Sequence, residues 1–190
     1  EYYYRTFNRE NVKLETSPIK KITSSGIKCK QRDIDLDVII CATGFYTTHF
    51  LKGIKVKSNG LELHELWEER GIQSYLGIMK HGFPNMFLAY GPNTNLFHNS
   101  ILIMIESQVN YIAQCIGECL QKGHQEIEVK NNVEEEYQKK INKSLEQSVW
   151  TDCKNWYKNE KGEIPNNWPY TTLYYMWVTL VPDFSKFTFR

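Results

Sequence analysis

Apolar side chains recur at helical spacing between residues 101 and 120. The positions that share this spacing are Ile101, Ile105, Val109, Ile112, Ile116 and Leu120. Such a stripe is typical of an amphipathic helix with one face in a core. Gly123 follows the stripe and can adopt the left-handed conformation that ends many helices. We therefore predict a long helix whose aliphatic stripe is buried.

Two shorter apolar runs predict strands that are covered on both faces. Leu36–Ala42 is mostly apolar, with β-branched residues at its centre, and ends at Thr43-Gly44, and Met86–Tyr90 ends at Gly91-Pro92. Runs of this length are too short for helices and suit the central strands of a parallel sheet. Ligands of doubly wound sheets bind at the carboxyl ends of such strands. We therefore expect a ligand site where these two runs end.

Turn-forming residues separate other short runs. Ser24-Ser25-Gly26 lies between Ile19–Thr23 and Ile27–Lys30, a pattern that predicts a hairpin. Asn59-Gly60 occupies the same place in a second pattern between residues 54 and 63. Asparagine followed by glycine is a strong hairpin signal because both residues tolerate positive φ angles. We expect two antiparallel hairpins.

The remaining segments give weaker patterns. Asn11–Glu15 alternates and predicts a strand, whereas residues 66–75 predict an irregular segment anchored by Trp67. A second helix is expected from Asn132, where Glu135 three residues later would complete a capping box. Toward the carboxyl end, aromatic residues and prolines alternate without a clear period. This composition indicates an irregular layer held by aromatic contacts on another surface.

Composition narrows the class of protein. The formal net charge of +1 over 190 residues gives no electrostatic basis for binding nucleic acid. The longest apolar run, Ile101–Ile105, is too short to span a bilayer. Five cysteines without a C-x-x-C pair favour a reducing, cytoplasmic compartment. Cys115 and Cys119 are four apart on one helix and could share a metal, but no histidine pair lies nearby in sequence, so we expect ordinary packing for them. None of the histidines has a metal-ligand spacing. Because Glu1 is not an initiator methionine, we expect the chain to begin within a longer protein.

An ordered set of motifs resembles the flavin-containing and Baeyer–Villiger monooxygenases. Asp37–Phe45 is similar to the ATG stretch of that family. Further motifs recur in the family's order: Tyr75–Gly77, Gly82–Phe87, Gly91-Pro92, Ile105–Val109, Asn155–Asn159 and Trp168-Pro169. The resemblance covers nearly the whole chain, yet the G-x-G-x-x-G turns that bind FAD and NADPH in the family are absent, as is its F-x-G-x-x-x-H fingerprint. It therefore implies the carboxyl-terminal part of such an enzyme.

The resemblance also implies a domain organisation. The chain would be α/β, part of a Rossmann-like, three-layer flavoprotein with two dinucleotide-binding domains and an irregular aromatic-rich C-terminal layer. Residues 1–42 would be the terminal portion of the NADPH-binding domain, and residues 43–150 the returning portion of the FAD-binding domain. Residues 151–190 would form an aromatic segment that packs on the cofactor domains. The missing N-terminal part of the same protein would be the chain's partner.

The implied activity is oxygenation of a ketone by the Baeyer–Villiger route. In the family, FAD reduced by NADPH reacts with O2 to give a C4a-peroxide, which transfers oxygen to the substrate. Oxygenation of a soft nitrogen or sulfur atom is one alternative. A non-catalytic fragment or diverged pseudo-enzyme that acts as a binding module is another. The sequence assigns no catalytic side chain and no metal.

The cofactor-binding residues implied by the resemblance lie mainly in two stretches. Thr43-Gly44 would lie on the crossover between the two cofactor domains. Gly91-Pro92 would let the backbone approach the flavin ring, and Asn93 would offer polar contacts. The N–H groups of Ser100 and Ile101 would face the flavin's pyrimidine carbonyls, where negative charge gathers on reduction. Alternatively, Ser100 simply caps a helix.

Trp156 is the last implied cofactor-binding residue. It matches a family tryptophan on a mobile loop that folds over the nicotinamide nucleotide. A packing anchor is the alternative, since the surrounding segment is rich in aromatic residues. Phe97 and His98 stand where the family commonly has small or aliphatic residues near the substrate, which leaves the choice of substrate open.

Overall fold

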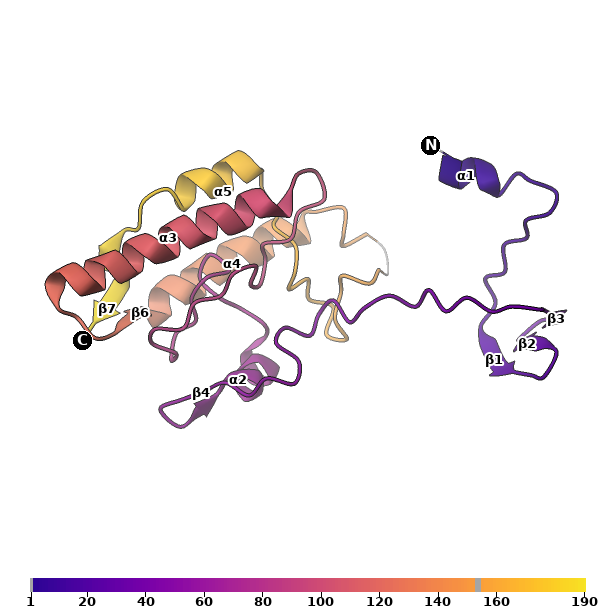
Figure 1. Ribbon diagram of the computed structural model, residues 1–190, viewed down its shortest axis with the longest axis horizontal. Coiled ribbons are helices and arrows are strands. Elements are labelled where there is room, and N and C mark those ends of the chain that lie inside the picture. Colours follow the sequence, from indigo (N-terminus) through magenta and orange to yellow (C-terminus); the bar gives the residue numbers. More distant parts are fainter. Residues whose placement is uncertain (1, 153–154) are drawn as a thin grey trace. The chain divides into compact units, whose positions relative to one another are not determined.

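The computed structural model describes residues 2–152 and 155–190 of the chain. It divides into two compact units, Glu1–Phe45 (unit 1) and Tyr46–Arg190 (unit 2), and Figure 1 labels most of their elements. Cys153, one of the five cysteines, lies outside the described residues. Within those residues, no helix combines the length and apolar character needed to cross a membrane.

Unit 1 is built on a three-stranded antiparallel sheet. Its elements are helix α1 (Tyr2–Thr6) and strands β1 (Ile19–Ile22), β2 (Gly26–Cys29) and β3 (Asp33–Asp35), with the strands in the order β1-β2-β3. Ile27 of β2 pairs with Ile22 on one side and with Ile34 on the other. The first predicted hairpin is therefore confirmed.

Two segments of unit 1 that were predicted as strands are irregular. Neither Asn11–Glu15 nor Leu36–Ala42 forms a strand, and Val38 and Ile40 are 72% and 86% exposed. A central strand needs neighbours on both edges for its N–H and C=O groups. Among the described residues, the N–H of Leu36 donates to the carbonyl of Ser25, but no strand pairs with Leu36–Ala42. The prediction of a strand here is wrong for this structure because apolar content alone cannot provide a pairing edge.

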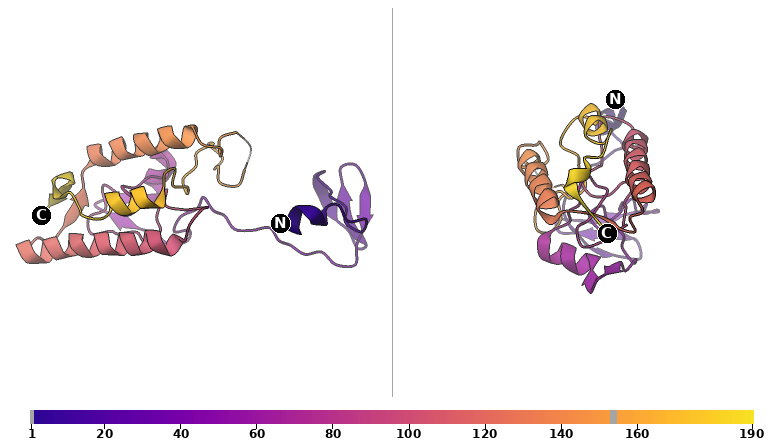
Figure 2. Two further views of the ribbon diagram at one scale, coloured as in Figure 1. Left: turned by 90° about the horizontal axis from the view of Figure 1, so that it is seen from above. Right: turned by 90° about the vertical axis from the view of Figure 1, so that its left-hand side faces the viewer.

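Unit 2 contains two long helices, α3 (Ile101–Lys122) and α4 (Asn131–Glu146). Figure 2 shows them on opposite sides of the unit, with the shorter helix α5 (Thr172–Val178) and strand β7 (Phe187–Phe189) between them. Gly123 ends α3 with φ of 73°, as predicted. The predicted cap of α4 is wrong, because Lys130 is the cap residue and its side chain makes no capping hydrogen bond.

The buried face of α3 is not the predicted aliphatic stripe. Its buried residues are Met104, Gln108, Tyr111, Cys115 and Cys119. Val109, Ile116 and Leu120 of the predicted stripe are 51%, 44% and 77% exposed. The helix is apolar on two faces, and helical periodicity cannot decide which one the rest of the chain covers. The face that carries Gln108 is covered because α5 contributes partners for it.

A hairpin and a short helix precede the long helices. Strands β4 (Lys57–Ser58) and β5 (Leu61–Glu62) form the second predicted hairpin, and helix α2 (Leu63–Arg70) follows directly. The prediction of an irregular segment from residue 66 is therefore wrong over most of α2. Glu62 caps this helix by accepting a hydrogen bond from the N–H of Glu65 at 2.9 Å. Trp67 does anchor the segment, since it is 4% exposed.

The carboxyl-terminal residues contain regular structure. After α5, a 3₁₀ turn, η1 (Phe184–Lys186), leads into β7, which pairs antiparallel with β6 (Ile127–Val129). Trp168 and Tyr175 are almost completely buried. The expectation of a wholly irregular layer was wrong because strand pairing and helix formation order most of this segment beyond residue 170.

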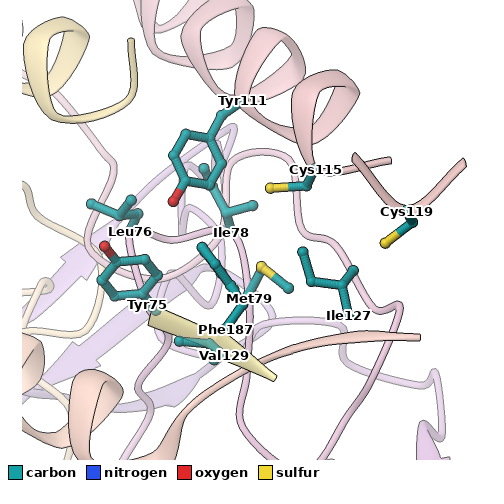
Figure 3. Close-up of a cluster of buried hydrophobic side chains, with 10 residues drawn as sticks. All are labelled: Tyr75, Leu76, Ile78, Met79, Tyr111, Cys115, Cys119, Ile127, Val129 and Phe187. Carbon is teal, nitrogen blue, oxygen red and sulfur yellow. The ribbon is translucent and has the colours of Figure 1, made fainter. Parts of the chain in front are cut away.

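Unit 2 has a main core and two smaller ones. Figure 3 shows the main core: Tyr75, Leu76, Ile78, Met79, Tyr111, Cys115, Cys119, Ile127, Val129 and Phe187. A second cluster lies at the amino-terminal end of α3 and consists of Leu96, Met104, Ile141, Leu145, Ile164, Trp168 and Tyr175. The third is Leu63, Trp67 and Phe83. The chain is thus mixed α/β, and all sheets among its described residues are antiparallel.

Candidate functional site

The predicted strand Met86–Tyr90 is instead an irregular segment that leads into a buried turn. Its backbone bonds to the preceding loop are from the N–H of Leu88 to the carbonyl of Ile78, at 2.8 Å, and from the N–H of Met86 to that of Phe83, at 3.3 Å. Tyr90 has φ of 61°, a left-handed conformation that ends any extended run. The next four residues, Gly91 to Thr94, are all buried. The expected ligand-binding turn is therefore a packed structural element.

Gly91 is required by close packing of two backbones. A Cβ atom at this position would overlap the carbonyl oxygen of Gly77. The reverse also holds, because a Cβ at Gly77 would overlap the Thr94 side chain and lie 2.9 Å from the carbonyl oxygen of Pro92. The glycine that was predicted to let the backbone approach a flavin thus lets it approach another loop of this chain.

Gln108 fixes the entrance of this turn from the buried face of α3. Its Oε1 accepts a hydrogen bond from the N–H of Tyr90 at 2.8 Å, and its Nε2 donates to the Tyr175 hydroxyl at 2.9 Å. The Tyr175 hydroxyl donates in turn to the carbonyl of Leu76 at 2.6 Å. Since buried polar groups are costly unless they are paired, this chain of bonds specifies one arrangement of the three segments.

The far side of the turn pairs with residues 165–168. The N–H of Asn93 donates to the carbonyl of Pro165 at 2.7 Å, and the N–H of Asn95 donates to that of Asn166 at 2.8 Å. The N–H of Trp168 donates back to the carbonyl of Asn95 at 3.0 Å. Two stretches about 70 positions apart in sequence therefore form one short ladder.

The amino-terminal end of α3 follows this ladder and is open to solvent. Ser100 is the cap residue, and its Oγ accepts from the N–H of Leu102 at 3.3 Å. Ser100 and Asn99 are exposed and Ile101 is half-buried. The N–H of Ile101 meets no acceptor within the part of the chain that the structure describes. An open helix start with an unpaired N–H suits a ligand that is rich in acceptor atoms.

Trp156 is exposed rather than buried. Its side chain is 60% exposed and lies beside the ring of Tyr157, with 4.4 Å between ring centroids. Tyr157 contacts Phe97 edge-to-face at 4.8 Å, so an aromatic chain joins Trp156 to the turn that precedes α3. The backbone carbonyl of Trp156 accepts a bond from the Thr47 hydroxyl at 2.9 Å. Such an indole is held at its backbone while its ring stays accessible.

Thr43-Gly44 lies elsewhere in the chain, in the last residues of unit 1. Both residues are exposed, and Gly44 has φ of 74°. A Cβ at Gly44 would meet nothing within 4 Å. The glycine is thus used for its backbone conformation and not for close packing.

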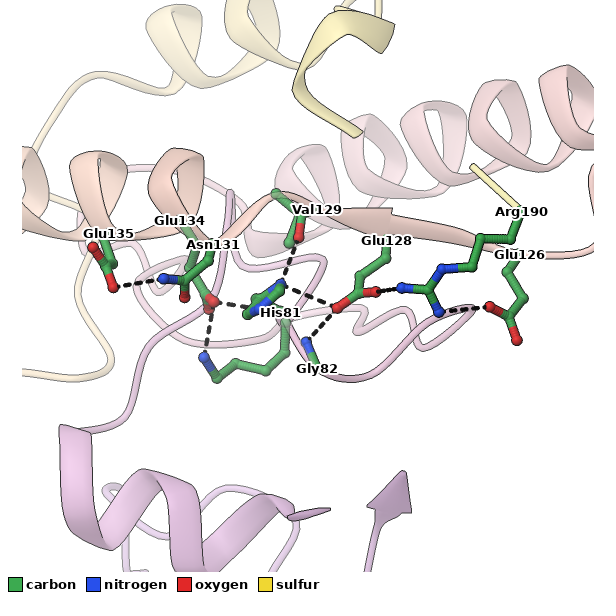
Figure 4. Close-up of polar contacts among 10 residues, drawn as sticks. His81, Gly82, Glu126, Glu128, Val129, Asn131, Glu134, Glu135 and Arg190 are labelled. Atoms are coloured by element: carbon green, nitrogen blue, oxygen red, sulfur yellow. Dashed lines mark hydrogen bonds and ion pairs between the residues drawn. The ribbon is translucent and has the colours of Figure 1, made fainter. Parts of the chain in front are cut away.

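A buried ion pair supports the loop that leads to the turn. The Nζ of Lys80 lies 2.8 Å from the Oε2 of Glu134, and the two side chains are 3% and 1% exposed. The N–H of His81 also donates to Glu134, at 3.1 Å, and Figure 4 shows how the network continues through Glu128 to Arg190. Burial raises the pKa of the Glu134 carboxyl, and the Lys80 ammonium opposes this shift. This network joins the loop to β6 and α4.

The chemistry available at the turn and the start of α3 is binding and orientation. Between residues 90 and 101 the only titratable side chains are Tyr90 and His98. No group of three possible metal ligands lies together within the described ranges. Four of the cysteines are free thiols, and burial, followed by the effect of Cys119, raises the pKa of Cys115 to about 12. The stretch thus offers backbone N–H groups, amides and close backbone approach rather than a general base.

Sequence reasoning missed the polar residues that organise the turn. These residues are Gln108 of α3 and Gln138 of α4, and both are buried. A glutamine within an otherwise apolar helix is the signal that could have found Gln108, whereas α4 is polar over most of its length and gives no such signal for Gln138. The prediction placed only the aliphatic stripe of α3 in the core and assigned no structural role to Gln108.

No family model matches the chain. Among curated proteins, it is 35% identical over 180 residues to the FAD-binding monooxygenase ktnD of Aspergillus niger, a match that covers 91% of this chain and 29% of the relative. It is 34% identical over 172 residues to the Baeyer-Villiger monooxygenase of Pseudomonas aeruginosa, with 88% and 32% covered. Cyclohexanone 1,2-monooxygenase of Acinetobacter is 35% identical over 167 residues, with 81% and 29% covered.

Solved structures of similar proteins extend this likeness to the fold. The chain superposes on a closed crystal structure of cyclohexanone monooxygenase with a TM-score of 0.79 and 26% identity, covering 99% of this chain and 37% of that one. A complex of OTEMO with FAD and NADP gives a TM-score of 0.82 at 25% identity, with 100% and 37% covered. The chain spans about a third of the length of these proteins. It is therefore homologous to a segment of the FAD-binding and Baeyer–Villiger monooxygenases.

Proposed function

We propose that the chain is the part of an FAD- and NADPH-dependent monooxygenase that borders both cofactors, in a protein that oxygenates a ketone by the Baeyer–Villiger route. One observation carries this proposal: the whole chain shares its fold with a complex that contains FAD and NADP, at a TM-score of 0.82. Curated relatives at 34–35% identity are a Baeyer-Villiger monooxygenase and a cyclohexanone monooxygenase, which favours a ketone as substrate.

The flavin would lie against the start of α3. When bound, FAD supplies the electron transfer and the oxygen activation. The N–H of Ile101 and the exposed Ser100 would face its acceptor-rich edge, while Gly91-Pro92 sets the path of the backbone toward α3. A helix start stabilises a nearby anion by roughly 0.3–1 kcal/mol, and by about 2 kcal/mol when partly buried. The unpaired N–H of Ile101 supports this assignment.

NADPH would lie near Trp156. The accessible indole of Trp156 suits stacking on a flat cofactor and does not suit a packing anchor, since 60% of the residue is exposed. We assign Thr43-Gly44 to the crossover between the two nucleotide domains, where its left-handed backbone turns the chain. Residues 1–42 would belong to the NADPH-binding domain, and residues 43–150, followed by the aromatic segment 151–190, to the FAD side.

The rest of a longer polypeptide would supply what this chain lacks. The two G-x-G-x-x-G turns that hold pyrophosphates are absent from the sequence. That polypeptide would also complete a Rossmann-like, three-layer arrangement and cover the exposed stripe Val109, Ile116 and Leu120 of α3. We place the protein in the cytoplasm, in keeping with four free thiols.

The test is oxygenation by the full-length protein. We expect purified protein to contain one FAD per chain, to oxidise NADPH in air, and to add one oxygen atom to a cyclic ketone, detected by mass spectrometry of the product. Product from an amine or thioether, with none from ketones, would move the assignment to heteroatom oxygenation. A full-length protein that holds no FAD and does not oxidise NADPH would support the binding-module alternative. The 190 residues alone should retain no FAD, because both phosphate-binding turns are missing.

A further inference from the structure

Asn93 has a completely occupied, buried side chain in the turn before α3. The residue is 1% exposed. Its Nδ2 donates to the carbonyl of Ile164 at 3.0 Å and, more weakly, to that of Asn167 at 3.3 Å. Its Oδ1 accepts from the Nε2 of Gln138 at 3.2 Å. Since donor and acceptor sides are both used within the chain, the amide is not available to contact a cofactor.

The backbone of Asn93 adds a second constraint. Its φ of 56° is left-handed, a conformation that asparagine tolerates better than most residues. Its N–H is bonded to the carbonyl of Pro165. Strained positions persist only where the surroundings over-determine them, and they gather at sites where geometry matters for function. The residue therefore fixes both the turn and the segment 164–167.

The segment that Asn93 holds is the one that follows Trp156. Asn166 donates from its Nδ2 to the carbonyl of Thr47 at 2.5 Å, and the Thr47 hydroxyl donates to the carbonyl of Trp156. On the other side, Phe97 of the turn contacts Tyr157. Asn93 thus lies where the stretch proposed to face the flavin meets the stretch proposed to cover the nicotinamide.

From these contacts we propose that Asn93 is a positioning residue that sets the placement of Trp156 relative to the start of α3, and so the placement of nicotinamide relative to flavin. The inference rests on the proposed function. Gln138 of α4 supports Asn93 in this role, because its bond holds the Asn93 amide in the orientation that donates to the carbonyl groups of residues 164 and 167. In this proposal both residues act through the protein and neither contacts a cofactor directly. A small displacement of such a supporting residue can lower the rate of the reaction by up to about 100-fold, because the reacting groups are then misaligned.

The test is Asn93→Gly in the full-length, FAD-containing protein. Glycine keeps the left-handed backbone and the backbone bond to Pro165 but removes all three side-chain bonds. We expect the fraction of NADPH oxidation that ends in hydrogen peroxide to rise at least threefold and NADP⁺ affinity to fall about tenfold. FAD content should stay near one per chain. Combined with Trp156→Ala, the two losses should be clearly less than additive, because Asn93 acts through the segment that carries Trp156.

Asn85→Gly is the matched control. Asn85 also has a left-handed φ, of 59°, and its side chain donates to the carbonyl of Gln125 at 2.8 Å and accepts from the N–H of Ile127 at 3.0 Å. Its bonds hold a different loop, against β6. Asn85→Gly should therefore lower the melting temperature without changing hydrogen peroxide release or NADP⁺ affinity.

The outcomes separate the two levels of the proposal. If the wild-type protein holds no FAD, the proposed function fails and the inference fails with it. If wild type couples NADPH oxidation to product, and Asn93→Gly only loses thermal stability as Asn85→Gly does, the inference alone is overturned. If Asn93→Gly does not fold, Gln138→Met decides, since it deletes the bond to Asn93 while keeping a side chain of similar length. Unchanged coupling and NADP⁺ affinity in a folded Gln138→Met protein would then contradict the inference.

Discussion

Unit 1 is held by short antiparallel strands, whereas unit 2 is built around three clusters of buried side chains. Among the described residues, Cys29 is the single buried apolar side chain of unit 1. The ends of the two predicted strands show the same contrast, since Thr43-Gly44 is exposed and Gly91-Pro92 is packed. An apolar run becomes a fixed element only where the same chain supplies its partners, and unit 2 supplies far more of them.

Thiol reactivity should show the largest difference between the units. Cys41 of unit 1 is exposed, whereas Cys115 of unit 2 is fully buried and burial raises its pKa to about 12. A thiol whose pKa lies three units above the ordinary value of 9.0 has about 1000-fold less thiolate at neutral pH than an ordinary thiol, and the thiolate is the reactive form. We expect iodoacetamide at neutral pH to modify Cys41 at least about 1000 times faster, measured by peptide mapping. Similar rates under native conditions would contradict the packing of unit 2, and rates should converge in urea.

Breaking an ion pair should cost more in unit 2 than in unit 1. Lys80→Met leaves the buried Glu134 carboxyl without its cation, so we expect a loss of about 3–5 kcal/mol in the free energy of unfolding. Lys28→Met in unit 1 breaks an exposed pair with Asp33, 3.8 Å apart, and should cost less than about 1 kcal/mol. Urea denaturation followed by probes in each unit measures both.

A double variant sharpens this prediction. Lys80→Met combined with Glu134→Leu removes both buried charges and should recover most of the stability that Lys80→Met alone loses. If Lys80→Met costs no more than Lys28→Met, the pair is not the buried support that the structure shows.

The smallest expected effect is a pH dependence in unit 1. Hydrogen bonds from the hydroxyl and N–H of Ser17, together with Arg32 at 2.7 Å, lower the pKa of Glu15 to about 2. Because the folded-state pKa lies below the ordinary value of 4.5, this contribution to stability is present above pH 4.5 and is lost as pH falls toward 2. A carboxyl ¹³C titration should give a midpoint near 2 for Glu15 and a clearly higher one in Ser17→Ala. A wild-type midpoint near 4.5 would contradict the contact.

Local signals in the sequence predicted local structure well. Gly123 ends α3 and Asn59-Gly60 makes a hairpin because these residues act through their own backbone conformations. The cap of α4 was misplaced by two residues, since Asn132 was predicted and Lys130 is the cap residue, while the neighbouring Asn131 donates its side chain to Glu135. A side chain that could cap a helix can instead bond to another group nearby, so the spacing of residue types alone cannot locate a cap.

Features that depend on distant contacts were not predictable in the same way. The buried face of α3 is decided by Tyr175, 67 positions after Gln108, which accepts the Gln108 bond. The structure of the candidate site also depends on residues that are distant in the sequence. Its turn was placed correctly along the sequence, but the burial of Asn93 depends on residues 164–167. The assignment of Ser100, Ile101 and Trp156 to cofactors stays a prediction, and it depends on parts of the protein outside this chain.

The central claim, that the start of α3 faces the flavin, is tested most directly by Ile101→Pro in the full-length protein. Proline removes one N–H, and the first helical position tolerates it because the preceding Ser100 is extended, with ψ of 129°. Asn131→Pro makes the same change at the first residue of α4, where Lys130 is extended with ψ of 142°. We predict that Ile101→Pro makes the flavin reduction potential about 10–40 mV more negative, the equivalent of losing roughly 0.3–2 kcal/mol of anion stabilisation, while Asn131→Pro leaves it unchanged. An unchanged potential and FAD affinity in a stable Ile101→Pro protein would contradict the claim.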